Sequence, residues 1–191
     1  MADISTKFAG LMLKNPVIAG SSGFTGNGDS IQQLEEAGAA AVVLKSLFEE
    51  QIIMEAQKDA GKGGVIYGYD NIDDYIGHYQ REHDLRKYLS LIEEAKKRVS
   101  IPVIPSINCI SSGEWQAFTK ELENAGADAL QLNMFVNPFE PNITSETLEE
   151  TYFTIISSVR EETTLPLIVK IGPYFTNLYN MAVKLSKSGI Q

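Results

Sequence analysis

Two lysines, two asparagines and several small or hydroxyl-bearing residues stand at the polar ends of short apolar segments. They are Ser21, Ser22, Gly23, Lys45, Ser46, Asn108, Asn133 and Lys170. A lysine that follows an apolar strand is costly to bury unless it meets an anion or a ligand. If these segments are parallel strands of one barrel, their carboxyl ends meet at the face that carries barrel active sites. The pattern therefore predicts a ligand site, against the alternatives that the lysines reach solvent and the asparagines tie down loops.

The segments that must position these residues are five apolar runs. They cover residues 16–20, 40–45, 102–108, 128–133 and 166–171. Apolar runs without alternation are typical of strands covered on both faces, as in parallel sheets. Segments with helical spacing of apolar residues separate them. The chain is therefore expected to repeat a βα unit with right-handed crossovers.

Capping residues indicate where some of the helices begin. Ser30 with Gln33, and Ser111 with Glu114, have the spacing of capping boxes. Thr176 is expected to cap the last helix.

A long helix is predicted over residues 78–98, whose basic last turn suits the helix dipole. The preceding stretch, roughly 55–77, is rich in Gly, Asp and Tyr and is expected to be a functional loop. His78 and His83 are five residues apart, so they do not share a helix face for a metal, and no metal site is expected. Cys109 has no adjacent base in the sequence and is expected to be a buried, inert thiol.

A hexapeptide of related sequence occurs three times, each with a glycine at its fifth position that is expected to end a helix. The copies cover residues 34–39, 122–127 and 185–190. This repetition favours a TIM-type (β/α) barrel over an open sheet. A complete barrel needs about 250 residues. Residues 1–191 are therefore expected to form a single domain, a C-terminally incomplete barrel of about five βα units.

The composition is that of an acidic globular protein. The 191 residues include 16 Lys and Arg against 25 Asp and Glu, a formal net charge of −9, and 43% are hydrophobic. With that charge and no basic stripe, nucleic-acid binding is not expected. No secretory signal or membrane-spanning run is visible, and a single cysteine cannot form an intrachain disulfide. A soluble, cytoplasmic protein is expected.

Four motifs, in order, resemble the dihydroorotate dehydrogenases, which are FMN-dependent (β/α)8 barrels of pyrimidine biosynthesis. Residues 6–16 followed by Ser22-Gly23 resemble the opening of that family, and residues 41–46 resemble its second strand with its lysine. Leu132-Asn133-Met134 is similar to its fourth-strand motif, and residues 167–174 are similar to its fifth-strand lysine motif. The resemblance covers the whole chain but only about the first two thirds of the family's barrel, and it is to the soluble class.

The resemblance implies roles for the strand-end residues. Lys45 would contact the flavin and the substrate carboxylate, Asn133 would hydrogen-bond either of them, and Lys170 would face the pyrimidine edge of the isoalloxazine. These three are the catalytic candidates. The other FMN-binding candidates are Ser21, Ser22, Gly23, Ser46 and Asn108, and the other substrate-binding candidates are Gly68 and Asn71. The family's glycine-rich phosphate-binding loops come later in the barrel.

Two departures from the family's pattern concern the substrate half of the site. The family's catalytic base is a cysteine or serine three residues after the motif asparagine, where this sequence has Val136, which cannot accept a proton. In the family's substrate loop, residues 65–68 replace an Asn-Ser-Met-Gly run, so that the glycine matches and the substrate asparagine does not. Ser111, Cys109 or Tyr67 are the alternative bases that this sequence offers.

The expected function is that of an FMN-dependent oxidoreductase, a flavoprotein that acts on a CH–CH bond of a small-molecule substrate, with dihydroorotate as the default. One alternative is a flavin-binding relative without a base and without dihydroorotate turnover. Another is a barrel lyase that uses Lys170 or Lys45 as a Schiff-base nucleophile. A homodimer is an expected assembly.

Overall fold

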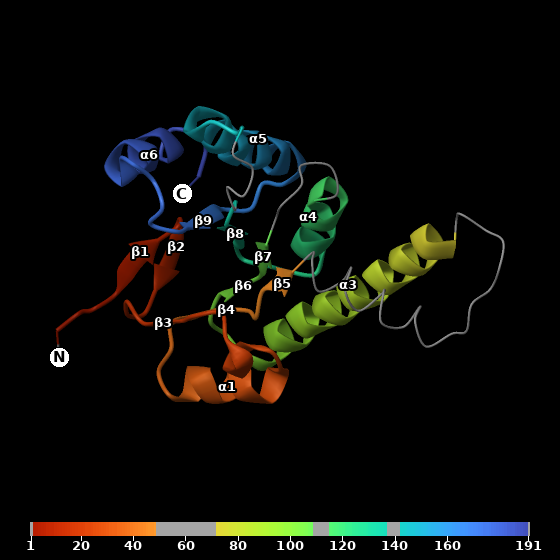
Figure 1. Cartoon of the computed structure of the whole chain (residues 1–191). Coiled ribbons are helices and arrows are strands. Elements are labelled where there is room, and N and C mark those ends of the chain that lie inside the picture. The colour runs from red at the N-terminus through yellow and green to blue at the C-terminus, as the bar shows by residue number, and fades with distance from the viewer. Residues whose placement is uncertain (1, 49–71, 109–114, 137–141, 191) are drawn as a thin grey trace.

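The computed structural model describes residues 2–48, 72–108, 115–136 and 142–190, and their side chains except those of 48, 72–84 and 115–117 (Figure 1). The strands are β1 (Thr6–Phe8), β2 (Leu11–Leu13), β3 (Ile18–Ala19), β4 (Ala41–Val43), β5 (Leu47–Phe48), β6 (Val103–Ile104), β7 (Ser106–Asn108), β8 (Leu130–Met134) and β9 (Leu167–Ile171). The helices are the short 3-10 helix η1 (Gly23–Thr25), α1 (Gly28–Glu36), α3 (Ile72–Arg98), α4 (Trp115–Asn124), α5 (Ser145–Glu162) and α6 (Leu178–Leu185).

Seven of these strands are parallel and follow one another in chain order. β3, β4 and β6 form one sheet, and β5, β7, β8 and β9 form a second. Two runs of chain join the two sheets, because three residues separate β4 from β5 and Pro105 alone separates β6 from β7. The helices lie around the outside of this arc (Figure 1). All five apolar runs therefore form strands as predicted, in the arrangement of a TIM-type barrel.

Alternation along the strands separates an outer core from an inner one. Val42, Val103 and Leu132 point outward and pack with residues of the helices, such as Ile92 of α3 and Ile156 of α5. The apolar neighbours of Val42 and Val103 in the sequence point the other way and belong to an inner cluster. It contains Leu13, Ala40, Ala41, Val43, Ile104 and Ala129, with Leu11, Ile18 and Ile168 packed against it.

The hairpin β1–β2 supplies Leu11 and Leu13 to this inner cluster and was not predicted from the sequence. Its two strands pair antiparallel, Thr6 opposite Leu13. The two turn residues, Ala9 and Gly10, have φ of 48° and 76°. A turn with positive φ at both positions suits the twist of a tight hairpin. Alanine at the first position hides this signal, because hairpin turns of this kind usually show Asn or Gly there.

Two predicted helix starts are wrong by one to three residues. Asn27, and not Ser30, caps α1, since its side chain accepts a hydrogen bond of 2.9 Å from the Ser30 amide. Asn177, and not Thr176, caps α6 in the same way. Asparagine is as good an N-cap as serine, so the more N-terminal start of α1 adds a turn to that helix.

The long helix α3 starts at Ile72, six residues before the predicted start, so residues 72–77 of the predicted loop are helical. The rest of that predicted loop, residues 55–71, lies outside the described residues. The predicted glycine ends are confirmed: Gly38, Gly126 and Gly189 have φ of 104°, 96° and 83°. The predicted cap at Ser111 lies outside the described residues.

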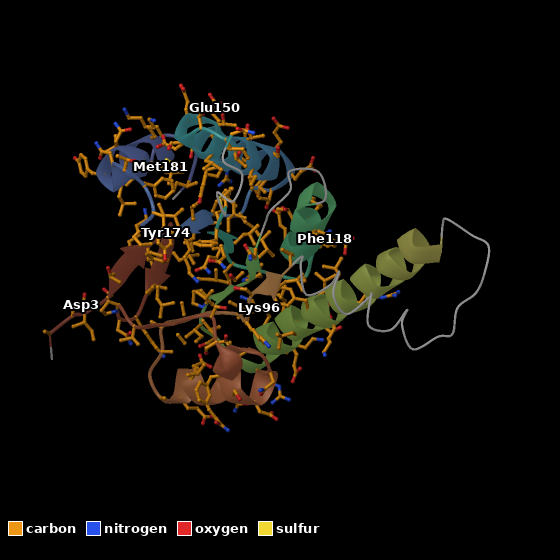
Figure 2. All side chains as sticks on the ribbon, in the orientation of Figure 1. Asp3, Lys96, Phe118, Glu150, Tyr174 and Met181 are labelled. Carbon is orange, nitrogen blue, oxygen red and sulfur yellow. The ribbon has the colours of Figure 1, made fainter. Side chains whose placement is uncertain are left out.

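Two polar contacts hold α3 and the loop before β9 in place. Lys96, labelled in Figure 2, lies 2.8 and 2.7 Å from the two carboxylate oxygens of Asp128, which also accepts from the Val103 amide. Glu123 accepts hydrogen bonds from Thr164 and Thr163 in the loop before β9. The bond from Thr164 is the main cause that lowers the pKa of Glu123. These contacts fix the starts of the strands that carry Asn133 and Lys170. No helix among the described residues is long and apolar enough to cross a membrane.

Tyr88 of α3 hydrogen-bonds the backbone of Ser106, directly after Pro105. Pro105 separates β6 from β7 and has no N–H to donate, while its carbonyl accepts from the Gln131 amide at 2.8 Å. The Tyr88 hydroxyl accepts from the Ser106 amide at 2.9 Å and donates to the Ser106 carbonyl at 3.2 Å. Burial raises the pKa of Tyr88, which therefore stays a neutral phenol with a proton to donate.

We predict that Tyr88→Phe lowers the free energy of unfolding by about 1–3 kcal/mol, because it leaves the buried amide of Ser106 without the hydroxyl oxygen that accepts its hydrogen bond. Urea denaturation measures the change. The matched control is Tyr179→Phe, whose residue is 81% exposed and whose loss of hydroxyl is expected to be neutral. Equal stability of the two variants would contradict the role given to Tyr88.

Candidate ligand site at the carboxyl ends of the strands

The register of the strands places three polar residues of the sequence prediction on one inner surface. Asn133 and Lys170 are direct neighbours across β8 and β9. Ser106 pairs with Gln131 across β7 and β8, so Asn108 lies opposite Asn133 two residues further on. Along each strand these residues alternate with outward-facing core residues. They stand on the carboxyl side of Ile104, Ala129 and Ile168 of the inner cluster.

A row of hydroxyl groups joins the first two strand ends to this surface. Ser21 Oγ lies 3.1 Å from Ser46 Oγ and accepts from the Ser46 amide at 3.0 Å. Ser46 Oγ lies 2.8 Å from Ser106 Oγ, which also accepts from Gln131 Nε2 at 2.8 Å. Sequence analysis identified Ser21 and Ser46 and missed Ser106 and Gln131. The missed signal was the alternation of polar with apolar residues at the ends of these two runs.

The structure thus brings together Ser21, Ser46, Asn108, Asn133 and Lys170. We call these residues, with Lys45, the strand-end site. Asn108 is 8% exposed, and its carboxamide oxygen is buried without a hydrogen-bond donor among the described residues. A buried acceptor without a partner costs free energy. Its place at a strand end suits a ligand that supplies an N–H or O–H group.

The two lysines are exposed, and among the described residues no carboxylate pairs with either. The Lys45 amide donates to the Thr25 carbonyl at 3.1 Å. The side chain of Lys45 lies against Gly26, where an added Cβ would come 3.6 Å from Lys45 Cδ. Lys170 projects from the end of β9 next to Asn133. Both ammonium groups can therefore meet an anionic ligand at this end of the barrel.

The loop after β3 is organised by its own hydroxyl groups. Ser22 Oγ accepts from the Phe24 amide at 3.3 Å, and Thr25 Oγ1 accepts from the Ser22 amide at 3.0 Å. No described atom comes within 4 Å of the position that a Cβ would take on Gly23. The backbone of this loop is consequently open on one side, while the Ser22 hydroxyl is already used locally.

The remaining candidates of the sequence analysis lie outside the described residues. These are Gly68 and Asn71 of the proposed substrate loop, and Tyr67, Cys109 and Ser111 among the alternative bases. The side chains of His78 and His83 are not described either.

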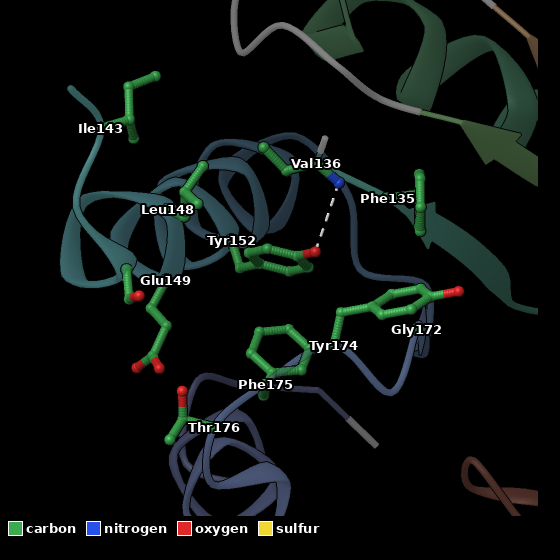
Figure 3. Close-up of a pocket in the computed structure, with 11 residues that line it drawn as sticks. Phe135, Val136, Ile143, Leu148, Glu149, Tyr152, Gly172, Tyr174, Phe175 and Thr176 are labelled. Atoms are coloured by element: carbon green, nitrogen blue, oxygen red, sulfur yellow. Dashed lines mark hydrogen bonds between the residues drawn. The ribbon is translucent and has the colours of Figure 1, made fainter. Parts of the chain in front are cut away.

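A pocket of about 390 Å³, not predicted from the sequence, lies beside the carboxyl ends of β8 and β9 (Figure 3). Val136, at the position of the family's base, lines it, and its amide donates to Tyr152 Oη at 3.4 Å. Tyr152 packs edge-on against Phe175, with ring centroids 5.4 Å apart. Glu149 also lines the pocket and pairs with Lys184 at 3.0 Å. The sequence signal is the set of aromatic residues that follows each of these strands.

Solved structures confirm the predicted fold class. The chain superimposes on phosphonopyruvate hydrolase with a TM-score of 0.56 at 13% identity, over 92% of this chain and 56% of that one. It superimposes on a dihydrodipicolinate synthase of Agrobacterium tumefaciens with a TM-score of 0.53 at 17% identity, over 91% and 52%. The fold and the strand-end residues thus define a TIM-type (β/α) barrel with a candidate ligand site at the carboxyl ends of its strands.

No protein-family model matches the chain. It is 28% identical, over 98% of its residues, to the catalytic subunit of dihydroorotate dehydrogenase B (NAD(+)) of Thermoplasma volcanium. It is 24% identical, again over 98%, to the same subunit of Endomicrobium trichonymphae. The chain spans 60% and 59% of the length of these two relatives. The resemblance to dihydroorotate dehydrogenases predicted from the four motifs is confirmed.

We predict that Asn108→Leu raises the free energy of unfolding of the protein without ligand, by up to about 1–3 kcal/mol, because it removes a buried acceptor that has no donor in the described part of the chain. Thermal or urea denaturation measures the change. Asn180→Leu, at an exposed position of α6, is the control and is expected to be neutral. A clear loss of stability in Asn108→Leu would mean that this oxygen is satisfied within the folded protein.

Proposed function

We propose that this chain carries flavin-facing residues of an FMN-dependent oxidoreductase that acts on a CH–CH bond of a small cyclic or carboxylated substrate, in pyrimidine metabolism as in its relatives. The observation that carries the proposal is the pairing of Asn133 with Lys170 across β8 and β9, next to the Asn108 oxygen, which has no donor among the described residues. The two relatives named above are dihydroorotate dehydrogenases, which makes dihydroorotate the first substrate to test.

The donors and charges of the strand-end site fit a flavin. When bound, FMN supplies a hydride acceptor whose reduced form is anionic near neutral pH. Lys170 provides a fixed positive charge at a strand end, where it favours negative charge that develops during the reaction. Asn133 offers a donor and an acceptor beside it, and Asn108 offers an acceptor for an N–H group. Lys45 is proposed to bind the substrate carboxylate, with Gly68 and Asn71 as further substrate contacts.

The exposure of Lys170 favours this function over a Schiff-base lyase. A lysine that attacks a carbonyl is activated by desolvation or by a neighbouring cation. Lys170 is exposed, and the structure shows it paired in register with a neutral amide of Asn133. We further propose that the protein is a cytoplasmic flavoenzyme with a small-molecule substrate. A homodimer is the proposed assembly.

The direct test is flavin binding. Purified protein is expected to show flavin absorption, or to bind added FMN with quenching of its fluorescence. Borohydride in the presence of a carbonyl substrate is expected to trap no adduct on Lys170. Failure to bind FMN, or an adduct on Lys170, would overturn the proposal.

We predict that Lys170→Ala slows flavin reduction or weakens flavin binding by a factor that corresponds to about 2.7–4 kcal/mol, the usual loss for one preorganised contact in such a site. Stopped-flow absorbance and fluorescence titration measure the two effects. Lys187→Ala, at an exposed position after α6, is the control and is expected to leave both unchanged. Equal behaviour of the two variants would exclude Lys170 as a flavin contact.

We predict that the protein reduces its flavin slowly with dihydroorotate, and that Val136→Cys accelerates this step. Oxidation of a CH–CH bond releases a proton as well as a hydride, and a positioned base contributes about 10²–10⁴-fold. The measurement is anaerobic bleaching of the flavin in single turnover. Val136→Ala is the control, since it also opens space but adds no base. Fast bleaching without any substitution would mean that another group acts as the base.

A further inference from the structure

The hydroxyl row formed by Ser21, Ser46 and Ser106 has a direction that Gln131 sets. Gln131 Nε2 donates to Ser106 Oγ at 2.8 Å, and an amide NH2 group has no lone pair to accept in return. Ser106 is fully buried, and the only acceptor among the described residues within reach of its proton is Ser46 Oγ at 2.8 Å. A buried hydroxyl proton left without an acceptor is costly. Ser106 therefore donates to Ser46.

The donors and acceptors of Ser46 can be assigned in the same way. Ser46 Oγ accepts from Ser106, so its own proton is directed to Ser21 Oγ at 3.1 Å. Ser21 Oγ also accepts the Ser46 amide at 3.0 Å, so both of its lone pairs are used. Its own proton has no acceptor among the described residues, and Ser21 is half-buried at the carboxyl end of β3.

We propose that Gln131 is a positioning residue that makes the Ser21 hydroxyl an obligate hydrogen-bond donor to the ligand of the strand-end site. The ligand presents an acceptor, a carbonyl oxygen or a ring nitrogen, to Ser21. This inference rests on the proposed function only in naming the ligand as FMN. A donor of fixed direction stabilises an anionic acceptor more than a neutral one. Gln131, three hydrogen bonds away from Ser21, thus favours reduced over oxidised flavin.

Gln131→Glu tests the direction of hydrogen-bond donation along the row. A carboxylate at this position accepts from Ser106, so each hydroxyl of the row then donates toward residue 131. Ser21 then donates to Ser46 and presents a lone pair to the ligand. The dissociation constant of oxidised FMN is measured by fluorescence, and the midpoint potential of the bound flavin by dye equilibration. The preference for reduced flavin is expected to fall at least tenfold, which lowers the potential of this two-electron couple by about 30 mV. Gln33→Glu, on an exposed face of α1, adds the same charge as a control.

A second measurement needs no flavin. In the native row, Ser21→Ala removes the acceptor of the Ser46 proton, whereas in the Gln131→Glu background that proton goes to Ser106. The increase in the unfolding constant caused by Ser21→Ala is therefore expected to be at least fivefold smaller in the Gln131→Glu background.

If Gln131→Glu does not fold, Ser106→Ala is the alternative variant, because it interrupts the hydrogen bonds of the row without adding charge. It is expected to reduce the preference for reduced flavin at least threefold.

The outcomes separate the two proposals. A protein that binds no FMN overturns the proposed function, while the unfolding experiment still decides the direction of the row. Unchanged flavin preference together with an unchanged penalty for Ser21→Ala overturns the role of Gln131 and leaves the proposed function standing.

Discussion

Alternation of side chains along parallel strands is the constraint on which the rest of this structure depends. Outward residues such as Leu132 must meet the helices, and inward residues must fill a narrow interior. Inside, the apolar cluster around Val43, Ile104 and Ala129 gives way, one step further along the strands, to Ser106 and Gln131. One more step leads to Asn108 and Asn133. Polar groups can occupy this interior because the next residue along each strand is apolar and is buried on the outer face, where it contributes hydrophobic stabilisation.

The interior polar groups differ in how well they are satisfied. The hydroxyl row uses almost every donor and acceptor it has, which suits a part of the barrel that must keep one geometry. Asn108, two residues closer to the carboxyl ends, has a buried oxygen to which no described residue donates. Lys45 and Lys170 stand at the ends themselves, exposed. The hydrogen bonding of the interior polar groups thus becomes less complete toward the carboxyl ends of the strands. This is the face at which we propose that FMN binds.

Val136 stands at the position that the family's base occupies. Val136 lies two residues after β8, where it lines a pocket together with Tyr152 and Phe175. A valine suits that pocket by packing, and it supplies no proton acceptor. Asn108, Asn133 and Lys170 lie on strands, whereas Val136 follows the end of β8, so the two parts of the family pattern belong to different kinds of backbone.

The fold class, the five strands and most of the strand-end site were predictable from sequence, because continuous apolar runs, glycine helix ends and polar residues after the runs are local signals. The hairpin β1–β2 and the exact caps at Asn27 and Asn177 were not, since very short strands and competing cap residues carry weak local signals. Gln131 and Ser106 look like minor polar interruptions of apolar runs. Only the register between β7 and β8 brings them within 2.8 Å of each other, and that register is set by packing between strands far apart in the sequence. The sequence by itself thus determined which residues reach the barrel's carboxyl end. The tertiary structure alone decided which of them touch, because hydrogen-bond partners depend on distances between strands that no local pattern encodes.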